Sequence, residues 1–534
     1  MGNKPAREER RDASDEEIKS LPHVADSIPF NVWVALLASG AERFSFYAVS
    51  TPWQNYIQND RGSIAVPGAL GLGQSTATNI TSAFYFVTFL SPTPWAILSD
   101  TWLGRYKTLC LAFFLNFCGC LVMFVTSLDV FGAQSIHVIG LAFAMILLGL
   151  GTGGVKATVS PFIGDQYTIV HPQLVVRRNG QKVIVHRSLT LQYVYNIAYW
   201  FTNIASLSLI ASTYLEKDVG FWAAYLLPLC SVWMLVPMLL FFNRYWVKLP
   251  PQANVLSQAA RVVKSTTRDR LRLDSAMPAY QQEKYGKCVD WDDAFVLEIK
   301  RGLRACRVMA CFVPFHLCMN QIVNNLVSQA GQMRLEGVPN DTIQALNSIA
   351  CVLLGPVLQK GLYPIVRKLG LNFGPIARIT CAFIIMSTSM AVAAGLQKII
   401  YEKGPCYESP LNCPASQNGS VSNDISVWAQ TPVYLLLSVA EILGFTTLSE
   451  YSYSEAPESM RSLVQALGQL SSGIGSALGI AFSPLSKDPQ ILYLYAGLAV
   501  TMITAAPAFW FAFRKHDIAL SSAPSATEPT IQNR

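Results

Sequence analysis

The sequence has few charged residues. Asp, Glu, Lys and Arg make up 14% of its 534 residues, whereas a soluble domain carries about 25%. Hydrophobic residues reach 51%, and the mean hydropathy is +0.33. Little charge, combined with apolar stretches of about 20 residues, is typical of helices that cross a bilayer. The chain is therefore predicted to be an all-α membrane protein.

Motifs of enzymes and of metal sites are also missing. The 12 cysteines include no CxxC pair and no other metal-ligand spacing. No Gly-rich phosphate loop and no spacing of a nucleophile and a base stands out. We therefore expect neither an enzyme nor a resident metal or cofactor. A cleavable signal peptide is not expected either, because the stretch from Met1 to Ser27 is polar and dense in charge.

Twelve apolar stretches are long enough to cross a membrane, and they form two groups of six. The division predicts two six-helix bundles, 29–245 and 306–513, with a linker at 246–305 and tails at 1–28 and 514–534. The last tail is rich in Ser, Pro and Thr and is predicted to be disordered. The twelve spans are 29–57, 78–99, 107–127, 136–163, 190–212, 220–245, 306–330, 342–364, 373–398, 428–449, 461–483 and 490–513.

The net charge of +7 comes from basic residues that cluster in alternate loops. The positive-inside rule places these loops, the linker and both termini in the cytoplasm. The excess of cations therefore reports orientation, and no nucleic-acid partner is expected. Within the linker, Phe295, Ile299 and Leu303 share one helical stripe. This pattern predicts an amphipathic helix that lies on the inner membrane surface.

The opposite loops carry the features expected of an outer face. N-x-S/T sequons begin at Asn79, Asn340 and Asn418. Asn340 and Asn418 are candidate glycosylation sites, whereas Asn79 lies too close to the bilayer. Cys406 and Cys413 share one outer loop, where a disulfide is a candidate in an oxidising compartment.

Full charges nevertheless occur inside the apolar spans: Glu42 and Arg43 in the first, Lys156 in the fourth and Glu441 in the tenth. A charge at bilayer depth costs roughly 3 kcal/mol on insertion scales, so such charges face one another or a watery cavity. Their repeated occurrence predicts a pathway for a solute or a proton. His316, among apolar neighbours, is interpreted as a packing residue, and Glu450 as an ion-pair partner at a helix end.

The loop between the second and third spans reads Asp100-Thr101-Trp102-Leu103-Gly104-Arg105-Tyr106-Lys107. It resembles the inner-loop signature of the major facilitator superfamily, in which an aspartate and basic residues lock neighbouring helix ends. Asp100, Gly104, Arg105 and Lys107 are therefore candidate gating residues. The loop 366–370, between spans eight and nine, is its equivalent in the second half, as expected of two related halves.

Further motifs resemble the proton-dependent oligopeptide transporters, particularly their fungal branch. They cover nearly the whole stretch from 29 to 513, in the order and spacing of that family. The matching segments are Glu42-Arg43-Phe44-x-Phe46-Tyr47, Gly151-Thr152-Gly153-Gly154-Val155-Lys156, Tyr199 to Leu207, Asn324 to Gly331, Gly404 to Pro410, Glu450 to Ser462, and Ser476 to Ile480.

The resemblance implies roles for residues in the spans. Glu42 and Lys156 match the proton-sensitive cluster, and their pairing would break when Glu42 is protonated. Arg43, Tyr47 and Lys156 suit a substrate carboxylate. Asn347 and Glu441 match the residues near the substrate amino group. A departure is Ser39, which replaces the first glutamate of the family motif and leaves the coupling scheme open.

The resemblance implies proton-coupled symport of di- and tripeptides by alternating access, with protons as the coupling ion. Two alternatives remain open: a specialised carrier or exporter of a peptide-like secondary metabolite with altered or absent proton coupling, and a peptide-sensing receptor that does not transport. A small-molecule substrate and the lipid bilayer are the expected partners. We expect a monomer with many membrane spans, located in the plasma membrane.

Overall fold

The computed structural model describes residues 10–522 with short gaps, and all structural statements concern these residues. The gaps are 62, 64–65, 129–133, 170, 177–180, 251–254, 270–271, 363–364, 367–372, 418–419 and 456–460. Most of the second inner loop at 366–370, the candidate Asn418 and the end of the tail at 523–534 therefore lie outside the described residues.

The first half is a bundle of helices that begins at Phe30. Its helices are α2 (Phe30–Ser50), α3 (Trp53–Gln58), α4 (Gln74–Leu90), α5 (Pro92–Leu98), η1 (Ser99–Leu103), α6 (Arg105–Thr126), α7 (Gln134–Asp165), α8 (Arg187–Ser206), α9 (Ser208–Asp218), α10 (Phe221–Phe241) and η2 (Phe242–Arg244). Two clusters of buried apolar side chains from these helices form its core.

The second half repeats this arrangement around one larger apolar core. Its α-helices are α13 (Asp293–Ala310), α14 (Val313–Asn320), α15 (Asn325–Gly331), α16 (Ala345–Val357), α18 (Pro375–Glu402), α19 (Thr431–Glu441), α20 (Thr447–Glu455), α21 (Arg461–Phe482) and α22 (Ile491–Ser522). Shorter turns are η5 (Thr342–Gln344), η6 (Leu358–Leu362), η7 (Pro414–Ser416), η8 (Val427–Gln430), η9 (Ile442–Thr446) and η11 (Ser483–Leu485).

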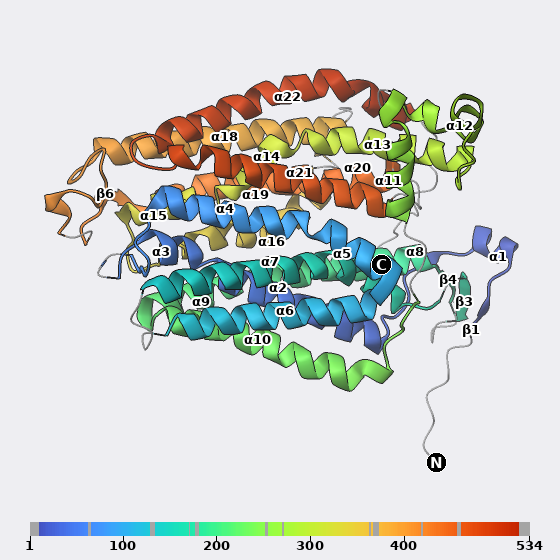
Figure 1. Cartoon of the computed structure of the whole chain (residues 1–534), viewed down its shortest axis with the longest axis horizontal. Helices are drawn as coiled ribbons and strands as arrows, with labels where there is room; N and C mark the ends of the chain where they lie inside the picture. The colour runs from blue at the N-terminus through green and yellow to red at the C-terminus, as the bar shows by residue number, and fades with distance from the viewer. Residues whose placement is uncertain are drawn as a thin grey trace, which may run out of the picture.

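Twelve membrane crossings can be traced through the described helices, six in each half. Five helices, or six with the bent pair 293–310 and 313–331, meet a length and hydropathy test alone. Other crossings are divided near a proline, as at Pro52 and Pro92. Such breaks are tolerated at membrane depth where they are buried in protein or line a cavity. The two halves lie side by side along their length (Figure 1).

The linker is folded and lies at one end of the molecule (Figure 1). We call this the linker end and its opposite the distal end. The linker contains α11 (Val255–Ser265), η3 (Thr267–Asp269), η4 (Leu273–Ala276) and α12 (Pro278–Tyr285). The stripe predicted for the membrane surface lies at the start of α13. Its Ile299 is fully buried and packs with Val262 of α11, so the stripe faces the linker rather than lipid.

A small sheet at the linker end was not predicted. The strands β1 (Arg10–Asp12), β2 (His23–Val24), β3 (Gln173–Val176) and β4 (Lys182–Val185) are ordered β1-β3-β4-β2, with α1 (Asp15–Ser20) between β1 and β2. The tail expected at 1–28 thus joins the segment between α7 and α8. At the distal end, β5 (Met333–Arg334) pairs with β6 (Asn423–Ser426). The last helix, α22, runs to Ser522, beyond the predicted boundary at 513.

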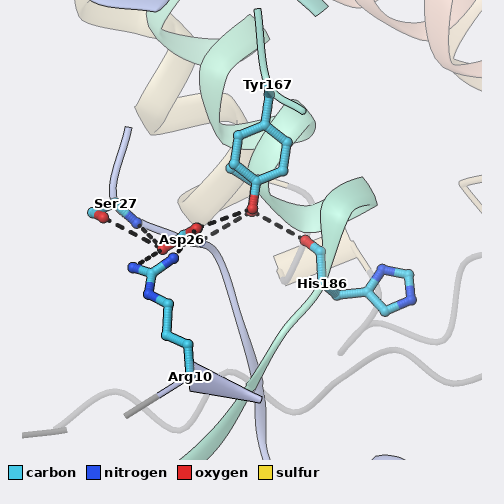
Figure 2. A network of polar contacts seen from close by, with 6 residues as sticks. Arg10, Asp26, Ser27, Tyr167 and His186 are labelled. Carbon is cyan, nitrogen blue, oxygen red and sulfur yellow. Dashed lines mark hydrogen bonds and ion pairs between the residues drawn. The ribbon is translucent and has the colours of Figure 1, made fainter. Parts of the chain in front are cut away.

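A polar network fixes this sheet to the start of α2. Arg10 donates to both oxygens of Asp26, at 3.0 and 3.1 Å, and Tyr167 donates to Asp26 Oδ2 at 3.1 Å. Figure 2 shows the three side chains converging, with Ser27 beside them. The backbone N–H of Asp26 donates to Thr190 of α8. Asp26 therefore joins the N-terminal strand, the segment that follows α7 and the start of α8.

Candidate functional site

A cavity of about 660 Å³ lies between the two halves. Its walls include Tyr47 and Tyr85 from the first half and Asn347 and Glu441 from the second. It continues along the linker-end portions of α20 and α21, where Ser452 and Gln469 line it. The cavity therefore extends from the centre of the molecule toward the linker end.

The first half supplies a buried cluster of charges beside this cavity. Glu42 is 1% exposed, and its Oε2 lies 2.8 Å from Arg43 Nε. The approach is an ion pair without hydrogen-bond alignment, since neither carboxylate oxygen has a well-oriented donor among the described residues. The two side chains belong to adjacent positions of α2, about 100° apart around its axis.

Lys156 does not form the predicted contact with Glu42. Its Nζ lies 3.9 Å from the ring centroid of Phe89 and 6.0 Å from that of Phe46. Within the described residues no ion-pair contact joins Lys156 to Glu42, although the ammonium is close enough for its charge to act on the carboxylate. The physical reason is that Glu42 already forms an ion pair with Arg43. The negative faces of the aromatic rings attract the ammonium of Lys156 instead.

The second half supplies a carboxylate of its own. Asn347 of α16 donates to Glu441 Oε2 at 2.9 Å, and Cys351 approaches the same oxygen at 3.7 Å. Ser438 in turn donates to Asn347 Oδ1 at 2.9 Å, which fixes the orientation of the amide. Glu441 is the last residue of α19, and the π-helical turn η9 follows directly. Such turns occur frequently at functional sites.

The predicted residues therefore differ in their relation to the cavity. Tyr47, Asn347 and Glu441 line it, whereas Arg43 and Lys156 lie just outside its wall. Lys156 is one side chain away, because Phe89 is itself a lining residue.

Sequence reasoning missed other lining residues. His316 was interpreted as packing, yet it lines the cavity and makes a hydrogen bond with Ser472 at 3.0 Å. Gln344 also lines the cavity, and its buried Nε2 has no hydrogen-bond partner in the described part of the chain. A polar residue at the start of an apolar span was the available signal for Gln344.

The inner-loop motif contributes an ion pair to a residue outside the motif. Arg105 Nη1 donates to both oxygens of Asp165, at 2.6 and 2.7 Å, so the start of α6 is joined to the end of α7. Asp100 remains near enough for the Arg105 charge to act on it. Gly104 has φ 76°, a left-handed conformation that a side chain would strain, and Lys107 is exposed. The pair predicted at Glu450 is confirmed, with Arg378 at 3.1 Å.

At the distal end, hydrogen bonds join the two halves. We call the joining residues on α3, α9, the loop before η5 and η5 itself the distal gate. Asn55 and Asn340 exchange two hydrogen bonds of 2.8 Å. The hydroxyl groups of Thr213 and Thr342 form a hydrogen bond of 2.5 Å, and Lys217 donates to the carbonyl of Gly337. The distal gate is therefore closed while the cavity extends toward the other end.

The predicted outer-loop features have mixed outcomes. The disulfide between Cys406 and Cys413 is present, with Cα atoms 5.6 Å apart. The glycosylation prediction at Asn340 is corrected, because its side chain is 1% exposed and bound to Asn55 and to the Val327 carbonyl. A glycan cannot be attached to an amide buried in this way.

Comparison with known proteins gives consistent matches. The sequence model described as "POT family" matches residues 106–501. The "Peptide transporter PTR_C" of Candidozyma auris is 40% identical over 509 residues, which cover 95% of this chain and 88% of that protein. The "Peptide transporter PTR2" of Saccharomyces cerevisiae is 35% identical over 513 residues, covering 96% and 84% respectively.

A solved structure of the POT family transporter PepTSo superposes with a TM-score of 0.70 at 19% sequence identity. The match covers 92% of this chain and 99% of that one. The likeness establishes the fold, which is the twelve-helix fold of the major facilitator superfamily.

Proposed function

The chain belongs to the POT family, and from this membership we propose that it carries di- and tripeptides across a membrane together with protons. The observation that carries the proposal is the polarity of the central site. Cations stand beside the wall that the first half provides, and Glu441 lies in the wall of the second. A cavity with opposite charges on opposite walls is complementary to a zwitterion, which a free peptide is at neutral pH.

We assign the peptide carboxylate to the first half. Arg43 offers a planar fork of donors, which matches a carboxylate with two hydrogen bonds. In this conformation the fork is held by Glu42. Protonation of Glu42 would remove that charge and release Arg43 for the substrate. This exchange links proton binding to peptide binding without a direct contact between Glu42 and Lys156.

The second half would receive the peptide amino group. Glu441 Oε2 is held by Asn347, so the carboxylate has a fixed orientation toward the cavity. Lys156 supplies a second cation whose position depends on aromatic faces, so a small movement of Phe89 would bring it to the substrate. Tyr47 adds a hydroxyl to the wall between the two groups.

We further propose an orientation and a state. The basic loops and the linker gather at one end, which we assign to the cytoplasm by the positive-inside rule. The closed distal gate then faces outward, and the molecule is in an inward-facing conformation. A plasma-membrane location and a monomeric carrier complete the proposal, with protons as the coupling ion. The matches to peptide transporters do not favour the two alternatives, a carrier of peptide-like metabolites and a receptor.

Counterflow in liposomes tests this proposal. Purified protein, reconstituted with unlabelled dialanine inside, is expected to accumulate labelled dialanine transiently. Dialanine with an acetylated amino group or an amidated carboxyl group should exchange far more slowly, because each lacks one of the two charges. Absence of counterflow with any free dipeptide would contradict the proposal. Equal exchange of free and blocked peptides would reject the two-signed site.

A further inference from the structure

Two buried carboxyl groups face each other in the distal gate. Glu216 lies near the end of α9 in the first half and is 3% exposed. Asp341 lies in the loop before η5 of the second half and is fully buried. The two carboxyl groups are within hydrogen-bonding reach of each other. They therefore meet across the boundary that must open in alternating access.

The hydrogen-bond partners of this pair are incomplete. Asn55 donates to Glu216 Oε1 at 3.0 Å. In the described structure no side chain donates to Glu216 Oε2 or to either oxygen of Asp341. Apart from the Glu216 carboxyl, the groups of the described residues that act on the Asp341 carboxyl are the backbone amides of Asp341 and Thr342. Two ionised carboxylates cannot donate to each other, and they repel. A single proton would supply the missing donor and remove one of the charges.

Among the residues that the structure describes, no cation takes the place of that proton. On α9, Lys217 donates to Gly337 instead, and no cation is among the charges that act on Glu216 or Asp341. The phenols of Tyr225 on α10 and Tyr434 on α19 are the other titratable groups facing the pair. Both are buried, and neither hydroxyl has a hydrogen-bond partner among the described residues. Arg61, beyond α3, interacts with His137 of α7.

We propose that Glu216 and Asp341 form a proton-binding site, in which one proton shared by the two carboxyl groups holds the distal gate closed. Opening of the gate separates the halves and exposes each carboxyl group to water, where it ionises. A cavity of about 680 Å³ on the distal side is lined by Asn55 and Asn340, which adjoin the pair. This cavity gives the proton a route to and from the outside.

The site has a consequence for coupling that rests on the proposed function. The proton enters from the outside when the gate closes and returns to the outside when it opens. It therefore makes closure depend on external pH without adding a transported charge. The proton that crosses the membrane remains the one assigned to Glu42.

The burial of Asp341 fixes the direction of this dependence. Burial raises the pKa of Asp341 to about 7, whereas an exposed aspartate in the open gate has a value of about 3.9. A group whose pKa is higher in the closed form stabilises that form at low pH. The stabilisation is lost as pH rises through 7. Between the two values, each pH unit changes the closed-to-open ratio by about tenfold.

The test follows the accessibility of one residue beneath the gate. Thr51 lines the central cavity and is 4% exposed. A Thr51→Cys reporter in intact cells is treated from outside with an impermeant maleimide, and modification of the peptide containing residue 51 is measured by mass spectrometry. Each gate variant carries the same reporter, so the ionisation of the thiol itself cancels in the comparison at each pH.

Between external pH 5.5 and 8, labelling in the parent relative to Glu216→Gln should rise at least about tenfold, as one pKa unit of difference requires. The glutamine amide can donate to the Asp341 carboxylate, so the closed gate no longer needs the shared proton. Asp341→Asn should behave like Glu216→Gln. If Glu216→Gln does not fold, Asp341→Asn tests the shared proton in its place. The matched control is Glu402→Gln, an exposed carboxylate at the distal end of α18 that pairs with Lys398. It should label as the parent does.

If both gate variants follow the parent at every pH, the shared proton does not exist. Loss of the pH response in the Glu402→Gln control would overturn the proposal as well, because the response would then come from surface charge. The measurement requires no proton-driven uptake. A failure of the proposed symport would therefore leave the pH dependence of labelling intact, and the two failures can be told apart.

Discussion

Glu441 is the residue whose assignment is most easily separated from fold stability. It sits in the cavity wall with Asn347 as its hydrogen-bond donor. Glu441→Gln keeps the shape but removes the charge proposed to bind the peptide amino group. A hydrogen bond to a charged group contributes about 1.5–3 kcal/mol, so KM for a free dipeptide should rise about 10- to 150-fold. The inhibition constant of an N-acetylated dipeptide should change far less.

Glu450→Gln is the matched control for this measurement. Glu450 is on the adjacent helix α20, is 63% exposed and pairs with Arg378. The Glu450→Gln variant should leave KM near the parental value, since exposed ion pairs contribute little free energy. An unchanged KM in Glu441→Gln would exclude this carboxylate as the amino-group ligand.

Arg43 tests the opposite side of the site. Arg43→Lys keeps the charge and loses the planar fork. We expect uptake of a zwitterionic dipeptide to fall at least about tenfold, corresponding to roughly 1.4 kcal/mol. The measurement is initial uptake normalised to the amount of folded protein from size-exclusion chromatography. Uptake equal to that of the parent would show that the carboxylate clamp is elsewhere.

Residue patterns predicted which side chains form the site better than they predicted its pairings. A charge at bilayer depth has a high free-energy cost, so its presence indicates a function. This argument identified Glu42, Arg43, Lys156 and Glu441. The sequence could not show whether Glu42 pairs with Arg43 or with Lys156. That choice depends on where Phe89 and Phe46 are placed by packing, and periodicity does not contain this information. Gln344 escaped notice because one amide at a span boundary is common.

Among the elements, the N-terminal strand β1 pairs with β3 and is also tied to Asp26 through the side chain of Arg10. Arg10 and Tyr167 both donate to Asp26 (Figure 2). Asp26→Asn should weaken both hydrogen bonds and detach β1 from β3 more often. We expect trypsin to cleave after Arg10 or Arg11 at least about threefold faster, measured in inside-out vesicles. Glu16→Gln, at an exposed position of α1, should cleave like the parent. Equal cleavage in Asp26→Asn would mean that the tail is held elsewhere.

The outer loop offers a second test at this scale. Cys406 and Cys413 are bridged, and the loop lies at the distal end that we assign to the outside. An impermeant maleimide should modify neither cysteine in intact cells, and both after treatment with a reductant. Mass spectrometry of the loop peptide measures this. Modification without reductant would reject the bridge in the cell, and protection after reduction would reject the orientation.

Elements formed by local patterns were predicted well, and elements formed by distant segments were not. Apolar runs located the spans, although breaks such as that at Pro52 divide several of them. The sheet at the linker end depends on pairing between residues that are about 160 positions apart, such as Arg10 and Val175. The stripe on α13 was correctly placed on one face. The prediction that this stripe packs against lipid was wrong. An apolar stripe has the same sequence pattern whether it packs against lipid or against the linker.

At the scale of the whole molecule, the closed distal gate and the cavity beneath it describe one end of a transport cycle. The two halves each have their own core, so they can rotate against each other without unfolding. The hydrogen bonds of the gate are polar and exchangeable with water. A two-half architecture was predictable from the grouping of spans around 246–305. The conformational state was not, because both states have the same sequence and differ only in contacts between the halves.

The central claim is that peptide transport is coupled to a proton on Glu42, and one measurement tests it directly. Purified protein in liposomes is given an inward proton gradient, and accumulation of labelled dialanine is followed with and without an uncoupler. The parent should accumulate peptide above the equilibrium concentration, and the uncoupler should abolish this accumulation. Glu42→Gln should fail to accumulate while still exchanging labelled for unlabelled peptide, because the site stays neutral but keeps its shape. Parental uptake that ignores both the gradient and the uncoupler would contradict the account.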